Sequence, residues 1–373
     1  AETSTPILIS QKDIEFKGTR DATFSSGMLM ASSNIFFKDI EGLEFNPKGF
    51  GLDLSANGKL TLVAKKLTIG GGKFTAQEGI DLTSAQQEME IGGLTEGPNF
   101  SSSKEITVTG QSAVTFKTAT FKTEQGMTVT SQDALMVGSG ALGVHIEIAM
   151  LLTLIGERIT VLNAALVSLK DIHLDAKEGV LQLGNASKIA RLQAKGEAKL
   201  TGQGITLSNA YLEGLNGVNL DGKTGKMVGG NYLSSTSVTV FSNKKTTLKG
   251  ATVALLKGTF KGYDSLKIEA MQGGVTVNGR NEEILLHSNK TINFTGAGDI
   301  SVLKGTLRAG EDIVVETKDH TLTIGDESYS PYLTANQKLN FTSKTLKLQN
   351  GKLKGYGGIA TNSDELTLGS LLS

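Results

Sequence analysis

Residues 192–221 read LQAKGEAKLTGQGITLSNAYLEGLNGVNLD. Short apolar–polar–apolar cores recur in this stretch, for example at residues 205–207 (Ile-Thr-Leu) and 218–220 (Val-Asn-Leu). Similar cores occur along most of the chain, usually after a glycine or a charged residue and before a small polar one. Because side chains alternate between the two faces of a strand, such cores predict short, half-buried β-strands.

The spacing of the cores predicts how the strands are arranged. Cores begin at residues 159, 172, 192, 205, 218 and 238, so successive starts lie 13, 20, 13, 13 and 20 residues apart. Weaker strands at 198–200 and at Leu212 fill the intervals, which makes one step about 6.5 residues and three steps about 20. Gaps of 21, 26 and 27 elsewhere fit the same steps with insertions. We therefore predict an all-β parallel β-helix (a solenoid) with about 20 residues and three short strands per coil.

Composition agrees with this prediction. The 373 residues include 46 Gly and only 4 Pro. Glycine suits tight corners between strands, and proline lacks the N–H that a parallel coil must pair with its neighbour. We find no linker, so we predict one continuous β-helix over residues 1–373, with residues 1–60 as an N-terminal cap or less regular coils. The chain begins with Ala1 rather than Met, and we expect a processed or trimmed product.

Charge and cysteine content exclude several classes of protein. The 37 basic and 37 acidic residues give a formal net charge of zero, so we expect no nucleic-acid partner. Without cysteine the chain has no disulfide, thiolate nucleophile or Cys-ligated metal. No apolar window is long enough for a transmembrane helix.

Candidate catalytic groups are sparse. The four histidines, at residues 145, 173, 287 and 320, have no metal-ligand spacing, and we interpret them as solvent-facing strand residues. Glycoside chemistry needs two positioned carboxyl groups. The adjacent carboxylates here include Glu282-Glu283 and Glu311-Asp312, which we place at solvated corners. We therefore predict no enzymatic activity, no cofactor and no metal.

A run of lysines is the remaining surface feature. It comprises Lys244, Lys245, Lys249, Lys257, Lys261 and Lys267. At about 20 residues per coil, Lys244 and Lys245 would stack near Lys267. Such a stripe could bind sulfated glycans or lipopolysaccharide, and the alternative is that lysine protects strand edges from pairing with other chains.

The stretches 192–221 and 333–368 resemble the haemagglutinin repeat of filamentous haemagglutinin-type exoproteins. That repeat alternates Leu-x-Ala-x-x-x-Leu-x-Leu with Leu-x-Asn-x-x-Gly-x-Leu-x-x-x-Gly. The resemblance covers most of the chain from about Leu60 onward. It implies a right-handed β-helix that Gram-negative bacteria export through an outer-membrane partner transporter (two-partner secretion).

The resemblance also implies a candidate transporter-recognition turn. The family's secretion domain carries Asn-Pro-Asn-Gly-(Ile/Leu), and residues 46–50 match it at Asn46, Pro47 and Gly49 but depart at Lys48 and Phe50. An ordinary Asn-Pro turn is the alternative.

The expected function is therefore a secreted or cell-surface β-helical rod. It would act as an adhesin, or as the stalk of a contact-dependent growth-inhibition effector, and we expect a monomer that contacts a target-cell receptor or glycan. Two alternatives stay open. One is a β-helical polysaccharide lyase or hydrolase using Glu282 or Glu283, and the other is a trimeric phage or secretion-system spike.

Overall fold

The computed structural model describes residues 6–18, 20–45, 51–93, 96–230, 237–279 and 284–369. Within these ranges all regular secondary structure is β-strand. No helix long and apolar enough to cross a membrane occurs among these residues. The strands pair in parallel as a β-solenoid of about 16 turns of roughly 22 residues. The predicted all-β parallel β-helix is confirmed.

The chain divides into two compact units. The N-terminal unit comprises Ala1–Glu178 and Ala190–Gln193, and the C-terminal unit comprises Gly179–Ile189 and Ala194–Ser373. The expectation of one continuous β-helix with a cap over residues 1–60 stays a prediction.

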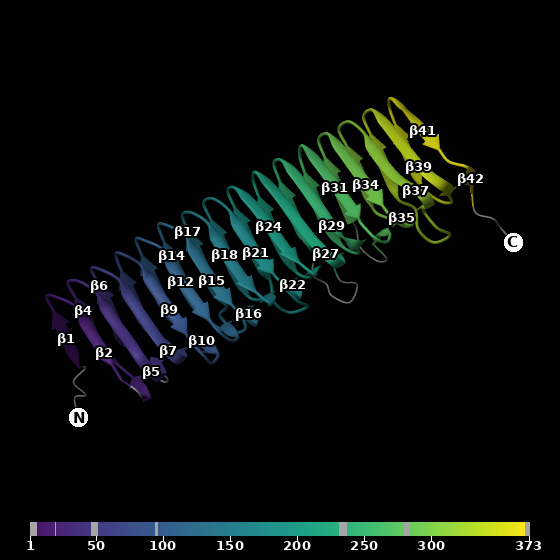
Figure 1. Ribbon diagram of the computed structural model, residues 1–373. Coiled ribbons are helices and arrows are strands. Elements are labelled where there is room, and N and C mark those ends of the chain that lie inside the picture. The colour runs from purple at the N-terminus through teal and green to yellow at the C-terminus, as the bar shows by residue number, and fades with distance from the viewer. Residues whose placement is uncertain are drawn as a thin grey trace. The chain divides into compact units, whose positions relative to one another are not determined.

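Both units are built from the same coil, which presents three strand segments in a constant order. The first segment lies in sheet A, and the second and third, here named B1 and B2, lie in sheet B. In some coils B1 and B2 are the two halves of one long strand. Figure 1 shows these segments stacked coil after coil within each unit.

In the N-terminal unit, sheet A contains β1 (Ile7–Ser10), β4 (Gly27–Ala31), β6 (Leu52–Ala56), β8 (Lys73–Ala76), β11 (Asn99–Ser102), β14 (Ala119–Thr123), β17 (Val144–Ile148), β20 (Ala164–Ser168) and most of β23 (Ala190–Ala194). B1 contains β2 (Ile14–Lys17), the first halves of β5 (Ile35–Phe45) and β7 (Leu60–Ile69), β9 (Ile80–Ser84), β12 (Ile106–Gly110), β15 (Met127–Ser131), β18 (Leu152–Gly156) and β21 (Ile172–Ala176). B2 contains β3 (Ala22–Phe24), the second halves of β5 and β7, β10 (Met89–Ile91), β13 (Val114–Phe116), β16 (Ala134–Val137) and β19 (Arg158–Val161).

In the C-terminal unit, sheet A contains β26 (Ala210–Gly214), β28 (Thr239–Ser242), β30 (Gly258–Gly262), β33 (Ile284–Ser288), β36 (Thr306–Ala309), β38 (Tyr332–Ala335) and β40 (Lys352–Gly355). B1 contains β24 (Glu197–Gly202), the first halves of β27 (Gly217–Gly229), β29 (Lys245–Leu255), β37 (Ile313–Ile324) and β39 (Lys338–Leu348), and β31 (Ser265–Ala270), β34 (Thr291–Gly296) and β41 (Gly358–Asn362). B2 contains β22 (Val180–Leu183), β25 (Gly204–Leu207), the second halves of those four long strands, β32 (Val275–Asn278), β35 (Ile300–Lys304) and β42 (Glu365–Leu368).

Coil length varies mainly at the corner from B2 to sheet A, and the turn between B1 and B2 takes smaller insertions. In sheet A, Asp53 pairs with Lys73, Lys73 with Asn99 and Asn99 with Thr120, so these coils take 20, 26 and 21 residues. The corner from B2 to sheet A spans residues 70–72 before β8 but residues 92–98 before β11. The corner from sheet A to B1 keeps three residues in both coils, at 77–79 and 103–105.

The same B2-to-A corner holds proline and left-handed glycine. Pro98 and Pro331 directly precede β11 and β38, where the chain needs no N–H for the sheet, and their carbonyl oxygens accept from Thr120 and Lys352. Gly258 opens β30 with a φ of +126°, and a Cβ there would collide with the carbonyl of Val238.

Strict alternation fills the interior. Most strand segments show the buried–half-buried–buried pattern, and the inward positions are Leu, Ile, Val, Phe and Ala. In the N-terminal unit, Phe74, Phe100 and Phe121 occupy the same inward column of sheet A. Their rings stack with centroids 4.8 and 4.7 Å apart and interplanar angles of 22° and 7°.

Buried hydroxyl groups satisfy backbone carbonyls at the corners. The hydroxyl of Ser131, which is 3% exposed, lies 2.8 Å from the carbonyl oxygen of Ser112 in the preceding coil and 3.2 Å from that of Ala134. Ser84 makes the same two kinds of contact, with Lys65 and Gln87. These hydroxyls contact carbonyl groups at the turn out of B1, and the Lys65 carbonyl also accepts from the N–H groups of Gln86 and Gln87.

Candidate functional site: a basic face on sheet A

The predicted transporter turn, formed by Asn46, Pro47 and Gly49, lies outside the described residues, as do Glu282 and Glu283 of the enzyme alternative. These predictions therefore rest on the sequence alone.

The six predicted stripe lysines do not share one surface. They lie on different sides of the coil: Lys245 and Lys249 in β29 and Lys267 in β31 are on B1, Lys244 is at the corner before β29, Lys261 is in β30 on sheet A, and Lys257 is at the corner before β30. Lys257 is 4% exposed, so it offers no surface for a glycan. The expectation of a single stripe is wrong because a coil turns through three faces within the 24 residues concerned.

The lysines on B1 face carboxylates. The Lys267 Nζ is 2.7 Å from the Glu269 Oε2, and Lys249 pairs in register with Asp221 on one side and Glu269 on the other. The hydrogen bond from Lys267, together with the charges of Lys267, Lys249 and Lys245, lowers the pKa of Glu269, and partial burial opposes this shift.

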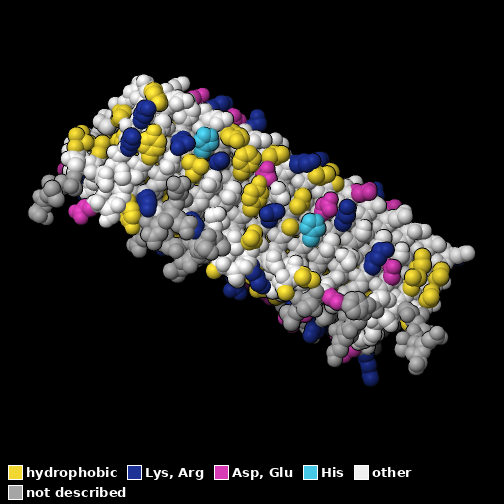
Figure 2. Space-filling view, turned by 180° about the vertical axis from the view of Figure 1, so that it is seen from behind, with side chains coloured by type: hydrophobic (Ala, Val, Ile, Leu, Met, Phe, Trp, Pro, Cys, Tyr) yellow, Lys and Arg dark blue, Asp and Glu magenta, His cyan; other side chains and the backbone are white. Residues whose placement is uncertain are grey.

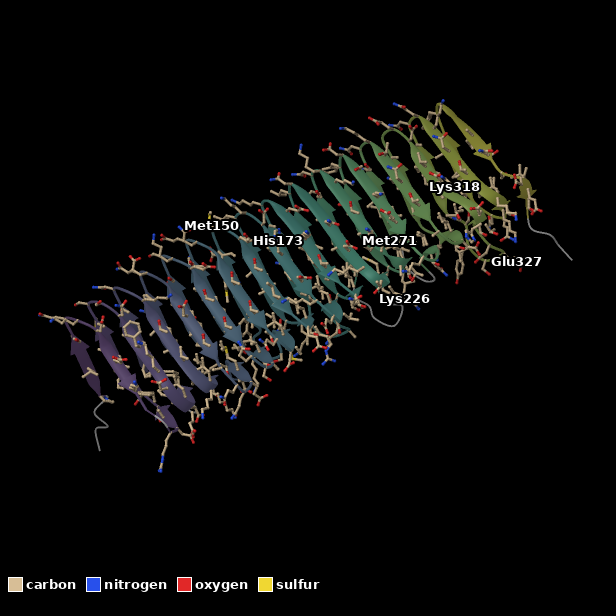
Figure 3. The ribbon with its side chains drawn as sticks, in the orientation of Figure 1. Met150, His173, Lys226, Met271, Lys318 and Glu327 are labelled. Carbon is tan, nitrogen blue, oxygen red and sulfur yellow. The ribbon has the colours of Figure 1, made fainter. Side chains whose placement is uncertain are left out.

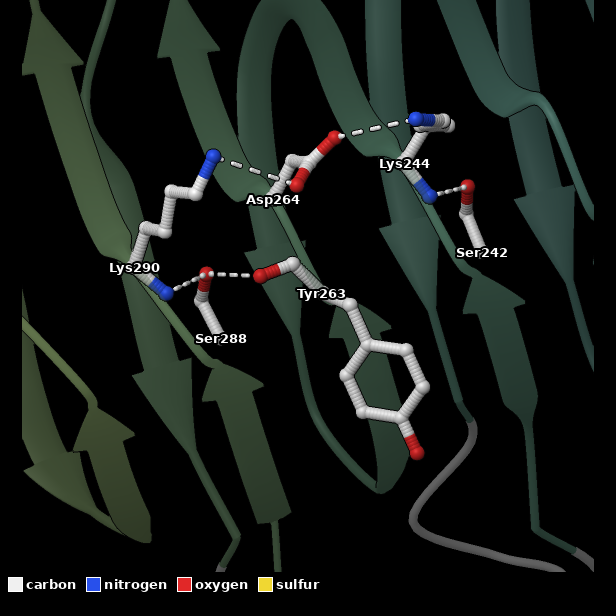
Figure 4. Close-up of polar contacts among 6 residues, drawn as sticks. All are labelled: Ser242, Lys244, Tyr263, Asp264, Ser288 and Lys290. Carbon is white, nitrogen blue, oxygen red and sulfur yellow. Dashed lines mark hydrogen bonds and ion pairs between the residues drawn. The ribbon is translucent and has the colours of Figure 1, made fainter.

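A carboxylate also bridges the lysines at the neighbouring corner. The two oxygens of Asp264 lie 3.9 Å from the Lys244 Nζ and 3.3 Å from the Lys290 Nζ, as Figure 4 shows. The backbone N–H groups of Lys244 and Lys290 donate to the hydroxyls of Ser242 and Ser288, which fixes this corner. The predicted lysines outside sheet A are thus largely compensated.

Sheet A of the C-terminal unit is different. Six successive strands, β28, β30, β33, β36, β38 and β40, contain no acidic residue. We call their outward side the basic face. In one outward column Lys261 pairs with His287 and His287 with Arg308. The column continues through Thr334 to Lys354. We call Lys261, His287, Arg308 and Lys354 the basic ladder.

Lys261, Arg308 and Lys354 of the ladder have no carboxylate partner in the part of the chain that the structure describes. Lys352 stands in the adjacent outward column, and it too lacks such a partner there. Because exposed cations without partners keep their full charge toward solvent, the basic face has a positive potential although the chain has no formal net charge.

Aromatic rings flank the ladder. Phe241 pairs in register with Lys261, and the ring of Tyr263 meets those of Phe241 and His287 edge-on, with centroids 5.5 and 6.2 Å away. Further along, the Lys354 Nζ lies 4.5 Å from the centroid of the Tyr356 ring. Figure 2, which turns the C-terminal coils to the left, shows basic and apolar side chains together on the face there, with acidic ones toward its edges.

The cations of the basic face contribute to a lowered pKa of Tyr332. Its pKa is lowered first by the Thr334 hydroxyl beside it, desolvation opposes this shift, and the charges of Lys354, Lys352 and Arg308 each lower the pKa by a smaller amount. Three cations from neighbouring coils therefore act on one phenol.

The other three histidines lie on three different strands, β17, β21 and β37. His145 Nε2 lies 3.9 Å from the Glu147 Oε2 on sheet A of the N-terminal unit. His173 projects from β21 (Figure 3). Asp312 caps the N–H of Lys338 at 2.8 Å, and no group of three His, Cys, Asp or Glu suited to a metal occurs among the residues described.

The N-terminal unit carries a shallow groove at its B2-to-A corner. It encloses about 810 Å³ and is lined largely by glycine backbone and apolar side chains, including Gly51, Gly72, Gly97, Met28 and Leu142. Its lining also includes Asp53, Lys73 and Glu96, so charges of both signs border it.

Sequence reasoning missed Arg308, Lys352 and Lys354 as members of a surface. Their signal was present in the spacing, because 261, 287, 308, 334 and 354 differ by 26, 21, 26 and 20 residues, which are coil lengths. Comparison of the chain with family models, with curated proteins and with solved structures finds no match.

Proposed function

We propose that this chain is a non-enzymatic adhesive segment of a bacterial exoprotein, secreted or displayed at the cell surface, whose basic face contacts a target-cell receptor or glycan. The observation that supports it most is the acid-free side of six consecutive sheet A strands. A passive stalk needs only coils that stack on their neighbours, and it has no need to separate its charges in this way.

The fold suits such a role. The interior is filled by the chain's own side chains, so recognition falls to the outward residues of the strands. Parallel stacking repeats those outward positions in straight columns about 4.8 Å apart. A long, shallow surface of this kind favours extended ligands over small molecules.

The two alternatives have weaker support. In the part of the chain that the structure describes, strands pair with other strands of the same chain, whereas an intertwined spike would pair between chains. Of the carboxylate pair at 311–312, Asp312 is engaged in capping the backbone.

Binding of the purified, fluorescently labelled chain to intact epithelial cells and Gram-negative bacteria tests the adhesive role. We expect saturable binding to one cell type, reduced by sulfated glycans. A folded chain that binds neither cell type would contradict the proposal and favour a stalk.

Export through an outer-membrane partner transporter is a separate part of the proposal. Substituting Asn46 and Gly49 by Ala in the secreted protein should block its appearance in the medium. Unchanged secretion would contradict a role of residues 46–50 in export.

A further inference from the structure

The charges of the basic ladder recur on every second coil. Lys261, Arg308 and Lys354 follow one another at intervals of two coils. His287 and Thr334 occupy the same column in the coils between them. With coils about 4.8 Å apart, the permanently charged rungs lie about 10 Å apart along the stack.

This spacing discriminates between classes of polyanion. Duplex nucleic acid carries about one charge per 1.7 Å of its axis, which is far denser than the ladder. A linear polysaccharide with one anionic group per disaccharide presents charges at a spacing close to that of the rungs. The intervening imidazole of His287 can form hydrogen bonds with sugar hydroxyls.

The rings along the ladder also suit a sugar chain. Phe241 lies beside Lys261 at one end of the ladder, and Tyr356, which is 65% exposed, lies beside Lys354 at the other. Exposed aromatic rings offer an apolar face to the C–H side of a pyranose and, for tyrosine, a hydroxyl for hydrogen bonding.

We propose that the basic ladder binds a linear polysaccharide carrying about one carboxylate or sulfate per disaccharide, which lies along the direction of coil stacking. Successive anionic groups contact Lys261, Arg308 and Lys354. The proposal assigns a ligand to the adhesive surface, and its significance at the cell surface rests on the proposed adhesive role. Purified polysaccharide tests the ladder, and intact cells test the adhesive role, so the two can fail separately.

Isothermal titration of the full chain with defined probes tests the ladder. Hyaluronan supplies one carboxylate per disaccharide, chondroitin sulfate adds a sulfate, and dextran is the neutral control. Replacing Lys261, Arg308 and Lys354 together by Ala should weaken binding about tenfold or more, because three ion pairs are lost. The matched control replaces Lys244, Lys249 and Lys267 by Ala. It removes the same net charge from the compensated lysines, and it should change the affinity by less than about threefold.

A second variant tests the spacing without changing the charge. Exchanging Arg308→Thr and Thr334→Arg moves one rung by a single coil, so the intervals become about 15 and 5 Å. We expect weaker binding of hyaluronan by this variant. Circular dichroism and the denaturation midpoint verify that all variants remain folded.

Several outcomes would overturn the proposal: equal loss in the ladder variant and the matched control, unchanged affinity after the exchange, binding of dextran as tight as that of the charged probes, or preference for duplex DNA. Binding of chondroitin sulfate no tighter than that of hyaluronan would assign the contacted anion as carboxylate, whereas tighter binding would show that the added sulfate also contributes. Both of these results support the ladder.

Discussion

At the scale of single residues, buried hydroxyl groups replace the hydrogen bonds that strand pairing cannot provide at corners. Ser131 lies against the carbonyl oxygens of Ser112 and Ala134. Ser131→Ala leaves both buried carbonyls without this donor, and we expect the free energy of unfolding to fall by about 1–2 kcal/mol. Urea denaturation provides the measurement, with Ser101→Ala on the exposed side of β11 as the control. Equal midpoints for the two variants would show that the hydroxyl contributes nothing.

The lowered pKa of Glu269 predicts how its ion pair with Lys267 responds to acid. Its lowered pKa, due first to the hydrogen bond from Lys267, means that the ionised carboxylate is favoured in the folded state. The stabilisation is therefore full above its usual pKa of 4.5 and is lost as the pH falls through the lowered value. Because the pair is near the surface, we expect it to contribute less than about 1 kcal/mol.

A double-mutant cycle with Glu269→Gln and Lys267→Met measures this pair. The coupling free energy from denaturation should be present at pH 7 and should disappear near pH 2, where the carboxylate is protonated. A coupling that is independent of pH would contradict the assignment.

Tyr332 reports the charge of the basic face. The Thr334 hydroxyl and the cations at Lys354, Lys352 and Arg308 lower its pKa, so its phenol should lose its proton at a lower pH than an ordinary tyrosine. NMR titration of the ring carbons follows this directly. Arg308→Gln and Lys354→Gln should each raise the pKa of Tyr332, whereas Lys267→Gln on B1 should not change it.

Individual residues also show what the sequence could and could not predict. The strand cores and the coil period followed from alternation, because a one-residue slip would expose an entire strand. Lys245 and Lys267 seemed to stack, yet Lys245 pairs with Ser265 and Lys267 with Thr247. Corner lengths shift such columns by a few residues, and no local pattern encodes that shift.

At the scale of elements, stacked columns carry the stability. Phe100 lies between Phe74 and Phe121 in one inward column of sheet A, with parallel rings on both sides. Phe100→Ala removes both ring contacts and leaves a cavity, so we expect a loss of about 3–5 kcal/mol in the free energy of unfolding. Phe100→Leu retains most of the volume and should lose clearly less. Similar losses in both variants, measured by denaturation, would show that filling this column is unimportant.

The B2-to-A corner is the element that tolerates change. Its length varies between coils, while the sheet A-to-B1 corner keeps three residues in the coils compared above. Pro98 and Pro331 could be read from the sequence as strand breakers. Their shared position before a sheet A strand could not be predicted from the sequence, because it depends on where the insertion in each coil falls.

At the scale of the whole molecule, zero formal net charge conceals an uneven distribution. In the part of the C-terminal unit that the structure describes, Lys244, Lys267 and Lys290 pair with carboxylates on B1 or at its corner. Lys261, Arg308 and Lys354 on the basic face have no such partner there. The sequence-based search found lysines that are close along the chain. Parallel stacking brings together residues one or two coils apart, which is why Lys261, Arg308 and Lys354 were not grouped before their register was known.

Binding of three labelled chains to intact cells tests the central claim most directly: the parent, the variant lacking Lys261, Arg308 and Lys354, and the control lacking Lys244, Lys249 and Lys267. We predict saturable binding of the parent and the control, and loss of binding by the ladder variant. Equal binding by all three would contradict the claim that the basic face of sheet A is the adhesive surface.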